Sequence, residues 1–212
     1  SPDNQIVTDK VWHELAFGLE SLGYDNATIR RRVAETAGFF GIESIFEKNV
    51  SELSGGQKQI LNLASIMAMQ PSVLILDEPT SQLDPIATSE FLVCVSKINR
   101  ELGTTVIITE HRLDEIFPLS DRVLVLENGE IVSDAPPENT GRNLKKINSK
   151  TFLSLPSPMQ IWDKADSGAS PCPVTVAQGR EWLEKYSQSH TLYPLYDEEI
   201  PEHKENIAVE LK

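Results

Sequence analysis

Two acidic residues, Asp77 and Glu78, follow an unbroken apolar run over residues 73–76. Such a run is typical of a parallel strand that is buried on both faces, and α/β proteins bind ligands at the carboxyl ends of these strands. Asp77 could hold Mg²⁺ directly or through water, while Glu78 could orient and deprotonate an attacking water. Alternatively, the pair only begins a loop, since acidic residues are common after strands.

His111 occupies an equivalent position, because it closely follows a second predicted buried strand over residues 105–109. The carboxyl ends of parallel strands meet at one edge of a sheet, so we expect His111 to lie beside Asp77 and Glu78. A lone histidine is usually structural. This position nevertheless makes His111 a candidate for contact with the γ-phosphate of a nucleotide.

Two further segments lie at predicted helix starts. Residues 54–57, Ser-Gly-Gly-Gln, precede a long helical pattern, and the unpaired N–H groups and dipole of a helix N-terminus favour an anion. Glycine also lets the backbone approach a phosphate closely. On their own, these residues favour an ordinary serine N-cap. Asp84 and Pro85 indicate the N-cap and first residue of another helix.

In this order, the segments resemble the signature motif, Walker B strand, D-loop and switch histidine of the ABC-type ATPases. Glu78 follows Ser54 by 24 positions, and His111 follows Glu78 by 33. The resemblance implies an α/β fold of the P-loop NTPase (ABC ATPase) type, with ATP and Mg²⁺ as cofactors. It also implies that the chain belongs to an enzyme that hydrolyses ATP.

The resemblance further implies a role for each matching residue. In the signature motif, which includes Gln57, the residues Ser54, Gly55 and Gly56 would contact the γ-phosphate of ATP held by the opposite subunit.

In the remaining motifs, Asp77 would serve the Mg²⁺ site and Glu78 would be the general base. Asp84 would communicate across the dimer, and His111 would contact the γ-phosphate.

The opening residues resemble one group within the ABC-type ATPases. Residues 2–7, 11–12 and 16–20 look like the ATPase subunits of energy-coupling factor (ECF) transporters, which import vitamins and metal ions. In that family this segment follows the Q-loop and, with the helical subdomain, meets the coupling helices of the membrane subunit. Residues 174–183 resemble the connector of tandem ECF ATPases. The implied partners are a second ABC ATPase domain and the membrane coupling subunit, at the cytoplasmic face of the cell membrane.

The chain divides into three predicted parts. Residues 1–70 would form the helical subdomain with the signature helix, and residues 71–135 the C-terminal half of the RecA-like core. Residues 136–212 would form an extended linker with one short helix, which begins at a capping box of Thr175 and Gln178.

Apolar periodicity and capping residues predict the element boundaries. The predicted helices cover residues 8–22, 26–38 (capped by Asn26 or Thr28), a stretch after Ser54, residues 85–102 and a start near Arg112. The alternation of strands and helices predicts a parallel sheet, and Asn128-Gly129 predicts the turn of a hairpin over residues 123–132.

No segment of the form G-x-x-x-x-G-K-[ST] occurs in the sequence. Gly18 and Gly23 have the right spacing, but Tyr24 and Asp25 follow them. We therefore expect an internal fragment of a longer ATPase, which on its own neither binds nor hydrolyses ATP. The apolar strands of such a fragment would expose edges and favour aggregation.

The composition argues against several other classes of protein. The formal net charge is −13 and the pI is about 4.7, which argues against nucleic acid as a partner. No apolar run approaches the roughly 18 residues of a membrane-spanning helix. Two cysteines, Cys94 and Cys172, are too few for a disulfide framework and are assigned no chemistry.

Two alternatives stay open. One is an ABC ATPase without a transport role, acting in DNA repair or on the ribosome, and the acidic composition counts against it. The other is a regulatory module without catalysis, and the presence of both Glu78 and His111 counts against that.

Overall fold

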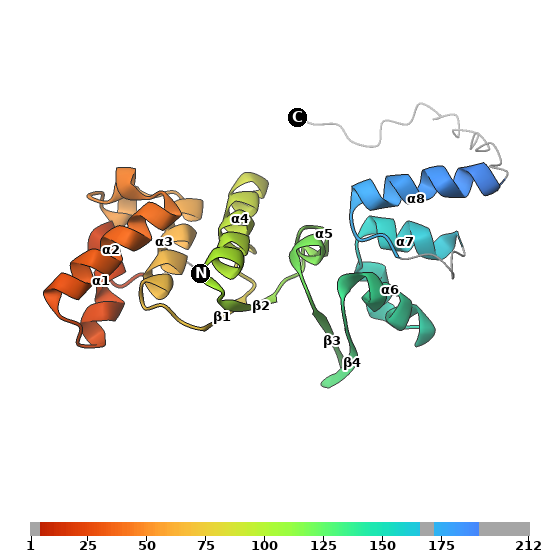
Figure 1. The fold of residues 1–212 in the computed structure, drawn as a ribbon, viewed down its shortest axis with the longest axis horizontal. Coiled ribbons are helices and arrows are strands. Elements are labelled where there is room, and N and C mark those ends of the chain that lie inside the picture. The colour runs from red at the N-terminus through yellow and green to blue at the C-terminus, as the bar shows by residue number, and fades with distance from the viewer. Residues whose placement is uncertain (1–4, 166–171, 191–212) are drawn as a thin grey trace, which may run out of the picture.

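The computed structural model describes residues 5–165 and 172–190. The α-helices are α1 (Val11–Ser21), α2 (Asn26–Phe40), α3 (Gly55–Ala68), α4 (Pro85–Leu102), α5 (Leu113–Ile116), α6 (Pro137–Lys146), α7 (Ser157–Lys164) and α8 (Val176–Ser189). The strands are β1 (Val73–Asp77), β2 (Thr105–Thr109), β3 (Val123–Glu127) and β4 (Glu130–Ala135). Short 3₁₀ turns are η2 (Glu43–Ile45), η3 (Val50–Glu52), η4 (Phe117–Leu119) and η5 (Lys150–Ser154). Figure 1 shows α1–α3 at one end, α4 with β1 and β2 in the middle, and α6–α8 at the other end.

Helices α1, α2 and α3 pack around one apolar core. Val11, Leu15 and Leu19 recur along α1 at helical spacing and are fully buried, as the periodicity predicts. They share their core with Leu61 and Ala64 of α3. Leu53, directly before the predicted signature segment at the N-terminus of α3, lies in the same core.

Helix α2 differs from the prediction at both ends. Its N-cap is Asp25, whose carboxylate accepts two backbone N–H groups at 3.0 Å each. The predicted cap at Asn26 or Thr28 is therefore wrong, because both residues already lie inside the helix. The helix continues two residues beyond its predicted end, to Phe40, and Gly41 closes it at a φ of 66°.

Strands β1 and β2 form a parallel sheet in which Ile75 lies opposite Ile107 and Asp77 opposite Thr109. One face of the sheet, including Leu74, packs in a core with residues of α3 and α4. On the other face, Ile75 is 70% and Ile107 50% exposed. The predicted burial on both faces is therefore wrong for the described residues, because helices cover only one face there.

Strands β3 and β4 form an antiparallel hairpin, as predicted. Asn128 and Gly129 make its turn with φ values of 52° and 83°, the left-handed backbone that a two-residue hairpin turn requires. Within the described part of the chain, β3 pairs with β4 and not with β2. In the described residues, the predicted parallel sheet therefore consists of β1 and β2, and the predicted hairpin of β3 and β4.

The described part of residues 136–212 contains three helices, although the sequence predicts one. They share a core of Leu144, Met159, Trp162 and Cys172, all buried. Burial raises the pKa of the Cys172 thiol to about 12. The prediction of an extended linker is wrong here, because the prolines lie in the first turns of α6 and α7 and start these helices. Residues 166–171 and 191–212 of the predicted linker lie outside the described residues.

Helix α8 begins as predicted. The Thr175 hydroxyl accepts the N–H of Gln178 at 3.1 Å, and the Gln178 side-chain oxygen accepts the N–H of Thr175, also at 3.1 Å.

No helix in the two described ranges is long and apolar enough to cross a membrane.

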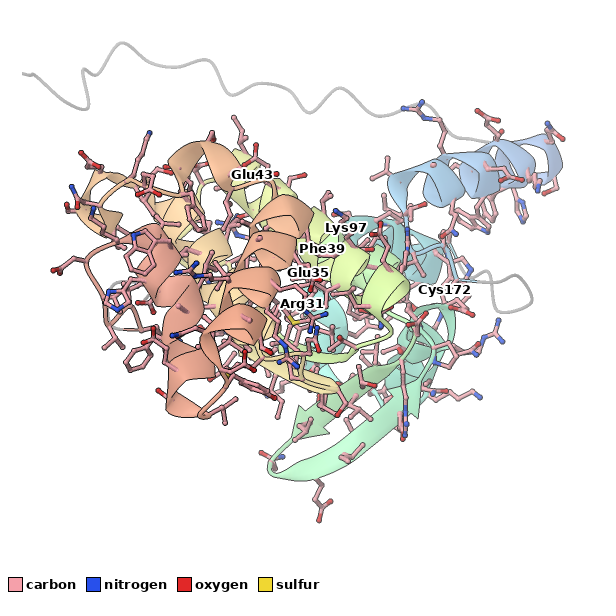
Figure 2. All side chains as sticks on the ribbon, turned by 60° about the vertical axis from the view of Figure 1, so that its left-hand side comes forward. Arg31, Glu35, Phe39, Glu43, Lys97 and Cys172 are labelled. Carbon is pink, nitrogen blue, oxygen red and sulfur yellow. The ribbon has the colours of Figure 1, made fainter. Side chains whose placement is uncertain are left out.

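Lys97 joins the three N-terminal helices to α4. Its Nζ donates to the carbonyl oxygen of Phe39 at 2.9 Å and lies 4.1 Å from the centre of the Phe39 ring. Figure 2 shows Phe39 on α2 beside Lys97 on α4. Because α2 also packs on α3, this contact helps to fix α3 relative to the sheet.

Candidate functional site

The carboxyl ends of β1 and β2 bring two predicted site residues to one edge of the sheet. Asp77 ends β1, and its Oδ1 accepts the Thr109 hydroxyl at 2.5 Å from the directly opposite position on β2. The next residue, Glu78, donates its backbone N–H to the carbonyl oxygen of Thr109 at 3.1 Å and to its hydroxyl at 3.2 Å. Thr109 therefore holds the Asp77 carboxylate and the Glu78 backbone together.

Glu78 and His111 form a hydrogen-bonded pair at this edge. The distance from His111 Nε2 to Glu78 Oε1 is 2.8 Å. The Glu78 side chain is 48% exposed and that of His111 83%, so solvent reaches both. The structure thus places Asp77, Glu78 and His111 together, as predicted from their positions after the two strands.

The backbone of Glu78 adopts an uncommon conformation. Its φ is 44°, in the left-handed region that residues other than glycine seldom occupy. Such conformations cost of order 1–3 kcal/mol and persist only where the surroundings hold them. They cluster at functional sites, so this conformation supports a functional role for Glu78.

Glu110 and Arg112 flank His111 and bind the segment that follows Glu78. The Glu110 carboxylate accepts the N–H and the hydroxyl of Thr80. Arg112 donates from Nη2 to the carbonyl oxygen of Leu83 at 3.3 Å and from Nη1 to the hydroxyl of Thr88 at 3.1 Å. Sequence reasoning assigned no role to Thr80, Glu110 or Arg112, since their partners lie 24 to 30 residues away.

The predicted signature segment forms the N-terminus of α3. Ser54 is the N-cap, and its hydroxyl accepts the N–H of Gln57 at 3.3 Å while the Gln57 side-chain oxygen accepts the N–H of Ser54 at 3.0 Å. This reciprocal capping box agrees with the interpretation of Ser54 as an ordinary helix N-cap. The side-chain oxygen of Gln57 is thus occupied by the helix cap. A role of Gln57 in nucleotide binding stays a prediction.

The two glycines of this segment have different surroundings. A Cβ on Gly55 would have no atom within 4 Å, whereas a Cβ on Gly56 would lie 2.9 Å from the Cβ of Ala87 in α4. Gly56 therefore permits a close approach between α3 and α4. That requirement is independent of any phosphate.

Asp84 caps α4 as predicted. Its carboxylate accepts the N–H groups of Ile86 and Ala87, both at 2.9 Å, and Pro85 is the first helical residue. A second contact joins α3 to the same region, because the Gln59 side chain donates to the carbonyl oxygen of Pro79 at 2.9 Å. The signature helix is thus tied to the loop after β1.

The residues at the sheet edge can supply only some of the ligands of a magnesium ion. Among the described residues, no group of three or more His, Cys, Asp or Glu side chains is arranged to hold a metal ion. Mg²⁺ is commonly held by one or two carboxylates together with substrate phosphates and water. The Asp77 carboxylate, exposed and oriented by Thr109, fits one such ligand.

Comparison with known proteins defines the class of this protein. A sequence profile of the family described as "ABC transporter" matches residues 4–81, which include the signature segment, Asp77 and Glu78. The fold is that of part of a P-loop NTPase domain. More narrowly, the chain belongs to the ABC transporter ATPases, which confirms the predicted resemblance and fold class.

Two curated relatives illustrate the match. An ABC transporter ATP-binding protein of Bacillus thuringiensis subsp. konkukian is 42% identical over 189 residues, which cover 88% of this chain and 33% of the relative. The energy-coupling factor transporter ATP-binding protein EcfA1 of Symbiobacterium thermophilum is 37% identical over 191 residues, 90% of this chain and 66% of the relative. The chain spans about a third of the length of the first of these relatives.

Two solved structures share the fold. The structure of cbiO1 from Clostridium perfringens, part of the ABC transporter complex cbiONQ, matches with a TM-score of 0.63 and 33% identity, over 76% of this chain and 64% of that one. The ADP conformation of MJ1267, an ATP-binding cassette of an ABC transporter, matches with a TM-score of 0.56 over 66% of this chain and 61% of that one. At 22% identity, the second match shows the fold alone.

Proposed function

We propose that this chain is the later part of the ATP-hydrolysing subunit of an ECF-like importer that powers the uptake of a vitamin or a metal ion. The observation that carries the proposal is the 2.8 Å pair of Glu78 and His111 at the carboxyl edge of the sheet. This pair occurs in a chain similar to EcfA1 of Symbiobacterium thermophilum and to cbiO1 of the cbiONQ complex.

The chemistry assigned to each residue follows from its place at this edge. Glu78 accepts a proton from the attacking water, which its half-exposed carboxylate can reach. His111 holds the Glu78 carboxylate through Nε2 and lies exposed beside it for contact with the γ-phosphate. Asp77 is the carboxylate ligand of Mg²⁺, which neutralises charge on the phosphates of ATP when bound.

The signature segment and Asp84 serve the ATP of a second ATPase domain. In this proposal, Ser54, Gly55 and Gly56 contact the γ-phosphate held by that domain, and Asp84 communicates between the two sites. The membrane coupling subunit binds the three N-terminal helices, where the aromatic side chains of Trp12 and Phe17 are partly exposed. The assembly then lies at the cytoplasmic face of the membrane.

The test of hydrolysis uses the full-length polypeptide that contains this chain and a phosphate-binding loop. We expect Glu78→Gln to lower its ATPase rate at least about 100-fold, because the amide cannot accept the proton, while ATP still binds. Glu130→Gln, the same chemical change in the exposed hairpin, should leave the rate unchanged. Full activity of the Glu78 variant would show that Glu78 is not the general base.

The 212-residue chain itself is expected neither to bind nor to hydrolyse ATP, since its sequence has no phosphate-binding loop. ATP hydrolysis by this purified chain that disappears in Glu78→Gln would contradict that expectation.

The transport role has a separate test. The full-length protein should co-purify with a small membrane protein. Co-purification with ribosomes or DNA would instead support an ABC ATPase without a transport role.

A further inference from the structure

Glu110 joins the two segments that carry the Glu78–His111 pair. Its Oε1 accepts the backbone N–H of Thr80 at 2.9 Å and the Thr80 hydroxyl at 2.5 Å. Its Oε2 accepts the backbone N–H of His111 at 3.1 Å. One carboxylate thus binds the residue two positions after Glu78 and the residue that pairs with Glu78.

The burial of Thr80 makes this contact hard to replace. Thr80 is only 1% exposed, so water cannot readily satisfy its N–H and hydroxyl if the carboxylate is removed. Charge-assisted hydrogen bonds of this kind are also stronger than neutral ones. The separation of 30 residues between Thr80 and Glu110 means that the contact is a tertiary connection and not part of a local turn.

The Glu110 contact also bears on the backbone of Glu78. Glu78 has a φ of 44°, and its N–H is held by Thr109 on one side. On the other side, the chain is held two residues later by the bonds from Thr80 to Glu110. Residues other than glycine keep such a conformation only where their surroundings fix it. Glu110 is one of the groups that fix it here.

We propose that Glu110 is a positioning residue for ATP hydrolysis: it keeps the His111 ring hydrogen-bonded to the Glu78 carboxylate. This inference rests on the proposed function and deepens it. Glu110 would act through its neighbours, because its carboxylate accepts hydrogen bonds from Thr80 and from the backbone of His111. The competing explanation is a purely structural role in satisfying the buried Thr80.

Glu110→Gln separates these explanations with little change in shape. The carboxamide has one acceptor oxygen and an NH₂ donor, so it cannot accept hydrogen bonds from both Thr80 and His111. If its oxygen keeps the bonds to Thr80, the NH₂ faces the N–H of His111 and repels it.

The first measurement uses the 212-residue chain and needs no nucleotide. The ring ¹⁵N signals of His111, assigned with a His111→Asn variant, report whether Nε2 donates to Glu78. We expect the signals in Glu110→Gln to move toward those in Glu78→Gln, where the acceptor carboxylate is gone. Glu130→Gln should match the wild type.

The second measurement uses the full-length polypeptide. We expect Glu110→Gln to lower kcat roughly 10- to 100-fold, because small misplacements of reacting groups cost about that much, with KM for ATP within about twofold of wild type. Thr80→Val, which keeps the N–H but loses the hydroxyl, should change kcat and the His111 signals in the same direction and by less. This second variant also serves if Glu110→Gln folds poorly.

The outcomes are distinguishable. If Glu110→Gln lowers stability but leaves the His111 signals and kcat unchanged, Glu110 only satisfies Thr80 and the proposal is wrong. If the wild-type full-length protein hydrolyses no ATP, the proposed function fails, and the ring signals still decide whether Glu110 positions His111.

Discussion

Gly55 and Gly56 are neighbours at the start of α3, but only Gly56 lies in close contact with another helix. A Cβ in place of one of its two Hα atoms would lie 2.9 Å from the Cβ of Ala87. Ala87 is not a flexible side chain, so the backbone of α3 or α4 would have to move. Both helix starts carry predicted nucleotide-site residues, and their spacing therefore depends on this glycine.

Gly56→Ala should lower the free energy of unfolding by about 1–3 kcal/mol, the usual cost of overpacking. Gly55→Ala is the matched control and should change it by less than about 1 kcal/mol, toward higher stability, because open space surrounds that position and alanine favours the helix. Urea unfolding of the 212-residue chain measures both.

A double-mutant cycle with Ala87→Gly completes this test. Removing the opposing Cβ should recover part of the loss in Gly56→Ala, with a coupling energy of at least about 0.5 kcal/mol. Equal losses in the Gly55 and Gly56 variants would show that the contact with Ala87 is unimportant.

At the scale of elements, Glu127 connects the hairpin to the helices that follow it. It ends β3, and its Oε1 accepts the hydroxyls of Ser149 and, at 2.6 Å, of Thr151 in η5. The Ser149 bond, followed by that of Thr151, lowers the pKa of the Glu127 carboxyl below its ordinary value of 4.5. The ionised carboxylate thus stabilises the junction between β3 and the C-terminal helices.

This shift predicts a pH dependence with a definite sign. A carboxyl whose pKa is lower in the folded state contributes its full stabilisation above about pH 4.5 and loses it as the pH falls through the folded pKa. The difference in unfolding free energy between wild type and Glu127→Gln should therefore be larger at pH 7 than below pH 4. Urea unfolding at both pH values measures it, with Glu130→Gln as the control. A difference that stays constant with pH would contradict this assignment.

The sequence predicts those features that depend on nearby residues. Asp84 as a cap, the Asn128-Gly129 turn and the capping box at Thr175 all involve partners within a few positions, and the structure has each of them. The common edge for Asp77 and His111 also follows from short-range patterns, because Asp77 is the last residue of one strand and His111 closely follows the other.

Contacts between distant residues could not be predicted in this way. Glu110 and Thr80 are 30 positions apart, and neither residue type alone indicates the other. The sequence does not predict the C-terminal core, because α6 contributes a single large aliphatic residue, Leu144, and so shows no apolar periodicity. The buried residues of this core come from several distant segments, namely η4, β3, α6, η5, α7 and the segment before α8.

At the scale of the whole molecule, the parallel sheet in the middle of Figure 1 has one covered and one uncovered face. The uncovered face carries Val73, Ile75 and Ile107, each about half exposed or more. Paired aliphatic side chains on an open two-stranded sheet favour association with another apolar surface. We therefore expect the 212-residue chain to self-associate through this face as its concentration rises.

The double variant Ile75→Thr, Ile107→Thr should weaken this association. Threonine keeps the strand preference of a β-branched residue, and both positions are exposed, so the unfolding free energy should change by less than about 0.5 kcal/mol per site. Sedimentation at several concentrations measures the association. Leu74→Thr is the matched control on the covered face: it should cost about 2–5 kcal/mol in stability without weakening association of the folded chain.

The same double variant distinguishes two explanations of the uncovered face. If further strands and helices of a longer ATPase pack on it, as the proposed function requires, the two threonines should destabilise the full-length protein by several kcal/mol, because two buried aliphatic side chains lose apolar contacts. Little change in the full-length protein would mean that the face stays exposed there, which contradicts the proposal that this chain is one part of a continuous ATPase core. Unchanged self-association of the variant chain would instead show that another surface mediates it.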